Sequence, residues 1–590
     1  MQRTHRLVSI LAIVPLLLQA FVASAQVAGP EASSGRAQKT VATARSFMVA
    51  AANPLAAEAG RAILRQGGSA IDAAIAVQMV LNLVEPQSSG IGGGAFILYW
   101  SAADRALRTY DGRETAPAAA TADRFQPPGQ WVTDIRELML GGRPVGVPGL
   151  LRVLELAHKR HGKLPWEQLF QPAIAMAESG FAVSPRLNRL IASDEALTRF
   201  APTRSYFLDA AGAPRAVGST LVNLPLAATL REIASGGADA FYRGAIAEDI
   251  VKAVREAPVH PGDMTLADLA NYQAKEREPV CGPYRAFTVC GMGPPSSGGM
   301  TVLSMLTMLS RFDLAKLKPV SPEAVHLFAE AAALAYADRN LYIADSDFVA
   351  VPVKGLLDPG YLADRSSHIR TDKAGPGRAR AGTPPQRGGA LPAFEWRFAA
   401  GETPELPATS HISIVDRDGN ALAMTTTIEA QFGSRQMVRG FLLNNQLTDF
   451  AIKPEEDGRP VANRVEAGKR PRSSMAPTIV FDAAGRPAIV AGSPGGAMII
   501  NYVAKVLIGM IDWGLDPQAA IDLPNMGSLG AGGVILERDT ALALAADALT
   551  QLGHRTTLRD ETSGLHVIRI DKDKLVGGAD PRREGVAIGD

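Results

Sequence analysis

Residues 409–428, "TSHISIVDRDGNALAMTTTI", are the part of the sequence that most constrains the fold. Two runs of apolar and β-branched residues flank the turn-forming letters "DRDGN", a pattern typical of an antiparallel hairpin. The turn centres on Asp418, and Thr409 and Thr427 are equidistant from it. In a regular ladder such residues face each other, with side chains about 5 Å apart on one face. The spacing therefore predicts a Thr409–Thr427 pair.

This threonine pair has two interpretations. Threonine favours strands, so a purely structural pair is the first. The second makes one of the hydroxyls a nucleophile. A serine site with a histidine base finds little support, because "AGSPGG" and "PPSSGG" both lack the G-x-S-x-G elbow. The spacing also offers no acid to orient His411, for which we favour a structural role.

A threonine can act without histidine when it begins a chain, because its own α-amine then serves as the base. A free α-amine has a pKa of about 7.7 to 8.0, close to neutral pH. This chemistry requires a cut between Ala408 and Thr409. Residues 371–408, just before that bond, are rich in Gly, Pro and Arg and have no hydrophobic period, which predicts a loose connector. The Thr409 hydroxyl would attack the Ala408 carbonyl, and water would hydrolyse the resulting ester.

The rest of the sequence alternates between helical and strand patterns. Apolar residues recur at helical spacing on both sides of "QGGS" near residue 67 and through most of 140–370. Strands and turns dominate the chain beyond residue 408, so we expect an α+β fold built in layers. The glycines of "GIGGGAFILYW" mimic a dinucleotide fingerprint, but they follow a helix and open a strand. That order is the reverse of the one a Rossmann turn needs, which excludes a nucleotide site.

Charge and metal-ligand spacing exclude further classes of function. The chain has 60 basic and 59 acidic residues and no long basic run, so we expect no nucleic-acid partner. No zinc motif such as H-E-x-x-H occurs, so we expect no metal and no other cofactor. The two cysteines, Cys281 and Cys290, flank "GPYR", a candidate hairpin turn. A disulfide and two free thiols both remain open.

The N-terminus predicts export. Residues 1–25 contain two arginines, a short apolar core and a small-residue pattern, Ala-Ser-Ala, at 23–25. We interpret them as a signal peptide cleaved after Ala25, which would leave the protein periplasmic or secreted. The alternative is a membrane anchor, but the apolar run is short for a span and polar residues and a proline interrupt it. We therefore expect no stable membrane anchor.

Several segments, taken together and in order, resemble the γ-glutamyltransferase family of N-terminal-nucleophile hydrolases. Besides the hairpin, they read "GGSAIDAAIAVQMVLNLVEPQSSGIGGGAF", "DGRETAP", "FLLNNQLTDF", "KRPRSSMAPTIV", "GSPGG" and "GGADPRREG". Each is weak alone, but their combination is specific and covers nearly all of the chain after the signal peptide. The resemblance implies a four-layer αββα sandwich. It also implies a precursor that cleaves itself into a large subunit, 26–408, and a small subunit, 409–590.

The resemblance assigns the reaction centre to four residues. Thr409 matches the nucleophile, and Thr427 matches a second threonine that hydrogen-bonds it and assists maturation. Gly495 and Gly496 match a backbone oxyanion hole, where N–H groups stabilise a tetrahedral intermediate. Taken without the resemblance, the two glycines are equally explained as a turn.

The resemblance also implies a substrate site. Arg113, Ser473 and Ser474 match residues that hold a substrate α-carboxylate, a task that suits the guanidinium fork. Gln446 and Asp449 match residues around the substrate α-amino group. Taken singly, Arg113 fits a surface salt bridge and the two serines fit caps at the start of a strand.

One residue departs from the family pattern. Glu429 stands where well-known members carry an asparagine that contacts the α-amino group. A carboxylate there can pair with an ammonium group or tune the site for a different acyl group. The segment between Asp449 and Ser473 also looks shorter than in members with a full lid loop, which predicts a more open acceptor side.

The function implied is cleavage of γ-glutamyl amides such as glutathione, with transfer of the acyl group to water, amino acids or peptides. The alternative within the same core is a cephalosporin acylase that takes glutaryl-like groups, or another amidase. A third hypothesis is a periplasmic binding protein that keeps the fold without processing. The presence of Thr409, Thr427, Arg113 and the glycine pair argues against it.

Overall fold

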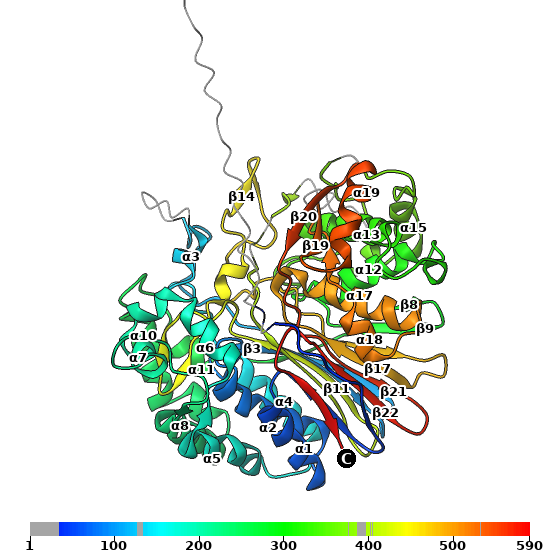
Figure 1. Ribbon diagram of the computed structural model, residues 1–590. Helices are drawn as coiled ribbons and strands as arrows, with labels where there is room; N and C mark the ends of the chain where they lie inside the picture. Colours follow the sequence, from blue (N-terminus) through cyan, green and yellow to red (C-terminus); the bar gives the residue numbers. More distant parts are fainter. Residues whose placement is uncertain are drawn as a thin grey trace, which may run out of the picture.

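The computed structural model is shown in Figure 1 and describes residues 33, 35–126, 134–375, 377–385, 397–401, 403, 405–530 and 533–590. The signal peptide expected at residues 1–25 lies outside the described residues. Among the helices that are described, none combines the length and apolar character needed to cross a bilayer.

Two antiparallel sheets of seven strands each form the centre of the molecule. The first, called the threonine sheet, has the strand order β23 (Val586–Gly589), β2 (Met48–Ala51), β10 (Ser410–Val415), β11 (Ala421–Thr427), β3 (Gly94–Ser101), β4 (Ala106–Gly112) and β7 (Lys275–Arg277). The second, called the disulfide sheet, has the order β1 (Ala42–Ala44), β22 (Leu575–Ala579), β21 (His566–Ile570), β17 (Pro487–Gly492), β16 (Thr478–Phe481), β9 (Phe287–Gly291) and β8 (Val280–Tyr284).

The central strands β10 and β11 of the threonine sheet are buried on both faces, and successive side chains of this sheet pack into different cores. Ile97 and Met424 pack with one group of helices. Their neighbours Leu98 and Ala423 pack with residues of the disulfide sheet and its helices. This alternation follows from the period of two along a strand. The two sheets therefore lie face to face, with a second apolar face on each available for helices.

Helices cover both outer faces, as Figure 1 shows with α1 and α2 on one side of the sheets and α12 and α17 on the other. The threonine sheet is covered by α1 (Pro54–Arg65), α2 (Ala70–Val84) and α4 (Leu150–His161). The disulfide sheet is covered by α12 (Gly298–Leu309) and α17 (Ile499–Ile511), and α13 (Pro322–Tyr342) packs on α12. The predicted α+β fold, a four-layer αββα sandwich, is confirmed.

Local sequence signals set the ends of these helices. Ser69 caps α2 in a capping box with Asp72, so two otherwise unpaired backbone N–H groups at the helix start are satisfied. Ser321 caps α13, and Pro322 stands at its first position, where no N–H is needed. These caps define the residue at which each helix begins.

The remaining helices and short strands surround this sandwich. The other helices are α3 (Ile135–Leu138), α5 (Gln171–Ser179), α6 (Pro185–Ala192), α7 (Ala201–Phe207), α8 (Leu224–Gly236), α9 (Asp239–Tyr242), α10 (Ala245–Arg255), α11 (Leu266–Ala270), α14 (Val353–Leu356), α15 (Pro359–Ser367), α18 (Pro517–Asp522) and α19 (Ala546–Gln551). The short strands are β5 (Phe181–Ala182), β6 (Thr220–Leu221), β12 (Met437–Val438), β13 (Phe441–Leu442), β14 (Glu455–Glu456), β15 (Arg459–Pro460), β18 (Met526–Gly527), β19 (Gly533–Glu537) and β20 (Arg555–Arg559).

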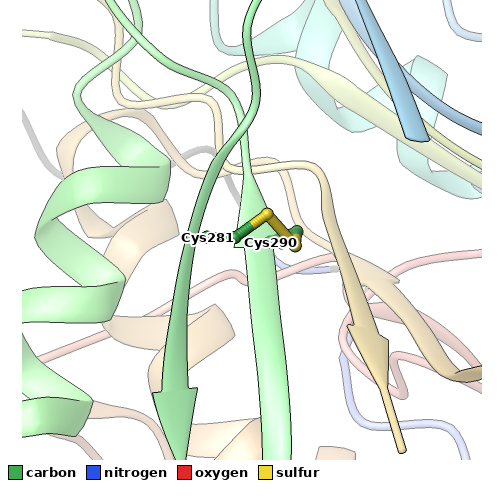
Figure 2. The surroundings of a disulfide bond; sticks show 2 residues. All are labelled: Cys281 and Cys290. Atoms are coloured by element: carbon green, nitrogen blue, oxygen red, sulfur yellow. A yellow bond between two sulfur atoms is a disulfide. The ribbon is translucent and has the colours of Figure 1, made fainter. Parts of the chain in front are cut away.

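The two cysteines lie on neighbouring strands at the edge of the disulfide sheet. Cys281 of β8 faces Cys290 of β9, and their sulfurs form a disulfide (Figure 2). The chain reverses at Arg285 and Ala286, so the "GPY" of the expected "GPYR" turn belongs to the strand instead. Arg285 adopts a positive φ of 55°, which this tight turn demands.

The end of the predicted connector differs from the expectation of a loose segment. Ala399 forms an isolated bridge with Val461, and Glu405, Leu406 and Ala408 are buried. The connector has no hydrophobic period, so its sequence does not predict that these residues are buried. The surrounding chain determines their burial. The last residues before Thr409 are thus part of the folded structure.

Candidate active site

The two threonines meet as the hairpin spacing predicts. Ser410 of β10 pairs with Thr426 of β11, and this register extends to Thr409 opposite Thr427. The Thr409 hydroxyl donates a hydrogen bond to the Thr427 hydroxyl over 3.0 Å, and the side chains are buried. The backbone N–H of Glu429 also donates to the Thr427 hydroxyl, over 2.8 Å. Thr427 is therefore a fixed acceptor for the proton of Thr409.

The bond between Ala408 and Thr409 is intact in this chain, and its carbonyl meets a backbone donor. The N–H of Gly495 donates to the Ala408 carbonyl oxygen over 3.3 Å. Thr409 has a φ of 93°, a backbone conformation that is strained for a β-branched residue. The hydrogen bond from Gly495 polarises the Ala408 carbonyl. The Thr409 hydroxyl is on the next residue, whose backbone has this uncommon φ.

The glycine pair is required by space as well as by conformation. Gly495 has a φ of 135°, and a Cβ there would lie 2.5 Å from the Tyr502 ring. Gly496 has a φ of 56°, and a Cβ there would lie 2.5 Å from the Glu405 carbonyl oxygen. Only glycine lets this turn, between β17 and α17, approach the chain around Ala408 so closely.

Arg113 lies in the loop after β4 and is completely buried. One of its guanidinium nitrogens pairs with the Asp449 carboxylate and also donates to the Arg472 carbonyl oxygen over 2.9 Å. Its Nε donates to the Pro471 carbonyl over 3.2 Å. The neighbouring Glu114 carboxylate is buried too, and this burial raises its pKa to about 8. Arg113 is therefore an interior residue, which excludes the surface salt bridge.

Gln446 and Asp449 stand on one short 3-10 helix, Gln446–Asp449. The Gln446 amide donates to the Asp449 carboxylate over 2.7 Å, on the oxygen that Arg113 also contacts. Burial raises the pKa of Asp449 to about 6, against the opposing effect of Arg113. Near neutral pH this carboxylate is ionised, which suits it to a cationic group of a ligand.

The two serines precede β16 by several residues and do not cap it. The Ser473 hydroxyl accepts from the Met475 N–H over 3.1 Å, and the Ser473 carbonyl accepts from the hydroxyl of Ser297 over 2.7 Å. The Ser474 hydroxyl accepts from the Arg339 guanidinium over 2.7 Å. Both serines are thus fixed from the helix α12 and α13 side.

Glu429 is buried and has a positive φ of 78°. Its carboxyl group accepts from the Leu406 N–H over 3.1 Å and from the side-chain amide of Asn445. Burial, and then the nearby Asp449, hold the pKa of Glu429 well above its usual range. This shift acts in favour of the protonated form of Glu429 in the uncleaved chain, where both carboxyl oxygens accept hydrogen bonds.

His411 has the structural role expected of it. Its two ring nitrogens lie 2.8 Å from the Thr425 hydroxyl and 3.0 Å from the Ser413 hydroxyl. Burial, together with His566, holds the pKa of His411 well below its usual range. The neutral imidazole therefore links β10 to β11 through Ser413 and Thr425. Neither of these hydrogen bonds involves Thr409.

Within the described part of the chain, a single group of side chains has the composition and spacing of a metal site: His326, Glu330 and His554. The two imidazoles hydrogen-bond each other over 2.7 Å, and His326 also contacts the Arg370 carbonyl over 2.6 Å. These bonds join α13 to the turn before β20, and thus the chain before Ala408 to the chain after it. The sequence did not predict this group.

One pocket, called the threonine pocket, collects the residues that the sequence singled out. It is lined by Arg113, Glu405, Leu406, Thr409, Thr427, Glu429, Gln446, Asp449, Ser473, Ser474, Met475, Gly496 and Ile499. Of the predicted catalytic and substrate-binding residues, Gly495 alone is not in this lining, and its N–H donates to the Ala408 carbonyl. Segments far apart in the sequence therefore converge on Thr409.

Sequence reasoning missed three charged residues of this site. Glu405 lines the pocket, and Arg339 contacts both Glu405 and Ser474. Arg583 donates to the Thr409 carbonyl over 3.3 Å. Arg583 lies in "GGADPRREG", a motif that carried the resemblance without an assigned role, so its basic residues were the available signal. The connector and helix α13 offered no comparable signal for Glu405 and Arg339.

Comparison with known proteins places this architecture. The sequence matches the family described as gamma-glutamyltranspeptidase over residues 56–590. It is 37% identical over 567 residues to the glutathione hydrolase proenzyme of Bacillus subtilis (strain 168), covering 93% of this chain and 92% of that protein. It is 32% identical over 575 residues to the acylase ACY 1 proenzyme of Pseudomonas sp. (strain SE83), covering 96% and 97%.

Solved structures agree with this placement. The cephalosporin acylase of Bacillus halodurans superposes with a TM-score of 0.79 at 28% identity, covering 95% of this chain and 98% of that one. With a family match over nearly the whole length and relatives above 30% identity that span both proteins, the chain belongs to the gamma-glutamyltranspeptidase family.

Proposed function

We propose that this protein is an exported, self-processing γ-glutamyl enzyme that cleaves γ-glutamyl amides such as glutathione. The cut between Ala408 and Thr409 yields a large subunit, 26–408, and a small subunit, 409–590. Thr409 then carries the γ-glutamyl group as an ester and passes it to water or to the amine of an amino acid or peptide. No cofactor takes part in this chemistry.

Self-cleavage begins with attack of the Thr409 hydroxyl oxygen on the Ala408 carbonyl. The hydroxyl proton leaves toward Thr427, which already accepts a hydrogen bond from Thr409. The charge that develops on the carbonyl oxygen is stabilised by the Gly495 N–H. The C–N bond breaks as this proton passes on from Thr427 to the departing nitrogen, leaving an Ala408 ester on the Thr409 oxygen and a free α-amine. Water hydrolyses the ester and releases the Ala408 carboxylate.

In turnover, the new α-amine of Thr409 takes the proton of its own hydroxyl as the oxygen attacks the substrate amide carbon. The substrate carboxylate is held by Arg113, Ser473 and Ser474, and its ammonium group by Gln446 and Asp449. The leaving amine takes the proton from the α-amine, and the acyl group stays on Thr409 as an ester. Water or a second amine repeats the attack in reverse and frees the enzyme.

The observation that carries this proposal is the set of contacts around one peptide bond. The Thr409 hydroxyl, its acceptor Thr427 and the Gly495 N–H all address the Ala408–Thr409 link. A structural threonine pair needs no donor on the preceding carbonyl and no positive φ at Thr409. The relatives named proenzymes support the same interpretation.

A gel of the purified protein tests the cut first. We expect two bands of the sizes of 26–408 and 409–590, and mass spectrometry should find Thr409 at the new N-terminus. Purified protein should also release nitroaniline from γ-glutamyl-p-nitroanilide. A chain that stays whole after long incubation would contradict the mechanism and favour the non-catalytic binding protein.

A second candidate function is an acylase for glutaryl-type amides. Two observations favour it: Glu429 replaces the family asparagine as a neutral buried carboxyl, and similar proteins include an acylase and a cephalosporin acylase. The rates on γ-glutamyl and glutaryl anilides separate the two. A higher kcat/KM on the glutaryl compound would make the acylase the main activity.

A further inference from the structure

Two residues just before the cleavage site line the threonine pocket of the uncleaved chain. Glu405 and Leu406 line this pocket together with Thr409, and Ala408 is fully buried beside it. Backbone contacts hold the segment along its length. The Ala497 N–H donates to the Glu405 carbonyl over 3.3 Å, and the Leu406 N–H donates to Glu429. This segment and Thr409 therefore share one pocket in the uncleaved chain.

The Glu405 carboxylate has a built site of its own. It forms an ion pair with the Arg339 guanidinium and accepts from the Thr403 hydroxyl over 3.0 Å. The Arg472 Nε lies 3.9 Å away, and the Arg339 nitrogen that reaches Glu405 also donates to the Ser474 hydroxyl over 2.7 Å. Burial acts to raise the pKa of Glu405, but the two arginines and Ser474 outweigh it, so the carboxylate is ionised.

Arg339 is held in place independently of Glu405. Its Nε donates to the Ser297 hydroxyl over 2.8 Å, and its Nη1 donates to the Asn340 side-chain oxygen over 2.9 Å. The remaining nitrogen, Nη2, is the one directed at Glu405 and Ser474. Arg339 is only 3% exposed. When Glu405 departs, a buried and positioned guanidinium loses its counter-charge, which is unfavourable unless another anion replaces it.

A substrate of Thr409 has to enter the threonine pocket, which Glu405 and Leu406 line in the uncleaved chain. Ser474 connects Arg339 with the pocket, because its side chain lines the pocket and its hydroxyl accepts a hydrogen bond from Arg339. We propose that Glu405 occupies the subsite for a substrate carboxylate before cleavage, and that Arg339 recognises that carboxylate afterwards. This inference rests on the proposed function, and it adds Arg339 as a specificity-determining residue and Glu405 as a positioning residue for the self-cleavage step.

The first test uses the uncleaved chain. Glu405→Ala removes the atoms of one acetate ion, so it should slow self-cleavage at least tenfold, and acetate should restore the rate. Sodium chloride at equal ionic strength should not restore it, because chloride cannot form the paired contacts of a carboxylate. Glu455→Ala on the exposed strand β14 is the matched control and should cleave like the parent protein. A slow variant that acetate does not rescue, or one that cleaves normally, overturns this part.

The second test uses the cleaved enzyme. Arg339→Gln should raise the KM for γ-glutamyl-p-nitroanilide at least tenfold, and change kcat/KM for 4-aminobutyryl-p-nitroanilide, which lacks the carboxylate, less than threefold. The inhibition constant of free glutamate should rise in parallel with that KM. Arg339→Lys, which keeps the charge, should recover part of the loss. Equal losses on both anilides, or an unchanged glutamate inhibition constant, overturn the role of Arg339.

The outcomes separate this inference from the proposed function. If the parent protein neither cleaves itself nor releases nitroaniline, the proposed function fails. If it does both while acetate has no effect and Arg339→Gln treats the two anilides alike, only the inference fails. Arg339→Gln could fold but stay uncleaved, and the inhibition constant of free glutamate is then measured with Arg339→Lys. An inhibition constant equal to that of the parent enzyme overturns the role of Arg339 in carboxylate recognition.

Discussion

Two hairpins of this chain each place a pair of reactive side chains face to face. Strand register explains both pairings, but it does not explain the other groups that the threonine pair needs. In β8–β9 the facing residues are Cys281 and Cys290, at the edge of the disulfide sheet. In β10–β11 they are Thr409 and Thr427, in the middle of the threonine sheet. The cysteine pair completes its chemistry with the hairpin alone. The threonine pair depends on a turn from the other sheet.

That turn carries Gly495, whose N–H meets the Ala408 carbonyl. β17, which precedes the turn, belongs to the disulfide sheet. The face-to-face packing of the two sheets therefore brings the hydroxyl pair and its backbone donor together. The difference between the hairpins can be tested by breaking one pair at a time.

The largest effect is expected from Thr409→Ala. Without the hydroxyl neither the self-cleavage nor the ester can form, so the chain should stay whole and turnover should fall on the order of 10⁴-fold or more. Gel analysis and nitroaniline release measure both. Thr409→Ser keeps a hydroxyl and should still cleave, more slowly. A Thr409→Ala protein that cleaves itself would remove Thr409 from the mechanism.

Gly495→Ala should have the next largest effect. The added Cβ would lie 2.5 Å from the Tyr502 ring at a φ that L residues rarely adopt, so the turn and its N–H must move. Loss of one such donor lowers a rate about 10²- to 10³-fold. The time course of cleavage measures this loss. Gly485→Ala is the control, since Gly485 also has a positive φ but no atom within 4 Å of the added Cβ.

Glu429 variants should change specificity more than processing. Glu429→Gln keeps a neutral group of the same size, so we expect self-cleavage within about threefold of the parent, as for other isosteric changes that leave packing intact. Glu429→Asn restores the residue of the family pattern and should raise the ratio of γ-glutamyl to glutaryl hydrolysis roughly tenfold. The two anilides measure that ratio. An unchanged ratio would separate Glu429 from acyl-group selection.

The pH dependence of kcat/KM of the cleaved enzyme should depend on the ionisation of Asp449. Burial raises its pKa to about 6, and only the ionised carboxylate attracts a substrate ammonium group. Therefore kcat/KM for γ-glutamyl-p-nitroanilide should fall as the pH drops through about 6. Asp449→Asn should lower the activity and remove the fall near pH 6, while the decline caused by protonation of the Thr409 α-amine, with a pKa of about 7.7 to 8.0, should remain. A fall near pH 6 that persists in this variant would have to come from another group.

The smallest effect on activity is expected at the disulfide. Cys281→Ser opens a short loop and should lower the free energy of unfolding by about 2 to 3 kcal/mol, as loop-closure entropy estimates for a short loop. Cleavage and kcat/KM should stay at the parent level, because this pair lies at the sheet edge. Unfolding with and without reductant measures the stability. Reductant should not destabilise the variant further.

Much of the fold follows from local sequence. The hairpin register, the capped helices α2 and α13, and the order of strands and turns around "GSPGG" are set by residues within a few positions of each other. The positive-φ glycines Gly495 and Gly496 are of the same kind, because few other residues tolerate that geometry. Resemblance to a family added the expected roles for residues that lie far apart in the chain.

Other features could not be predicted this way. The sequence around Glu405 indicates a loose connector, yet Glu405 is buried against Arg339 of helix α13. Glu429 looks like a negative charge in the sequence, but burial beside Asp449 favours its neutral form. Both depend on the surroundings that distant segments create, and no spacing rule in the sequence carries that information.

The sequence by itself determined that Thr409 and Thr427 face each other, because strand periodicity and the position of a turn fix the register of a hairpin. Only the tertiary structure decided which groups surround that pair. The Gly495 N–H comes from a turn after a strand of the other sheet, and the Arg113–Asp449 and Glu405–Arg339 pairs each join segments far apart in the sequence. Their electrostatic effect depends on burial between two packed sheets, and burial is a property of the assembled fold.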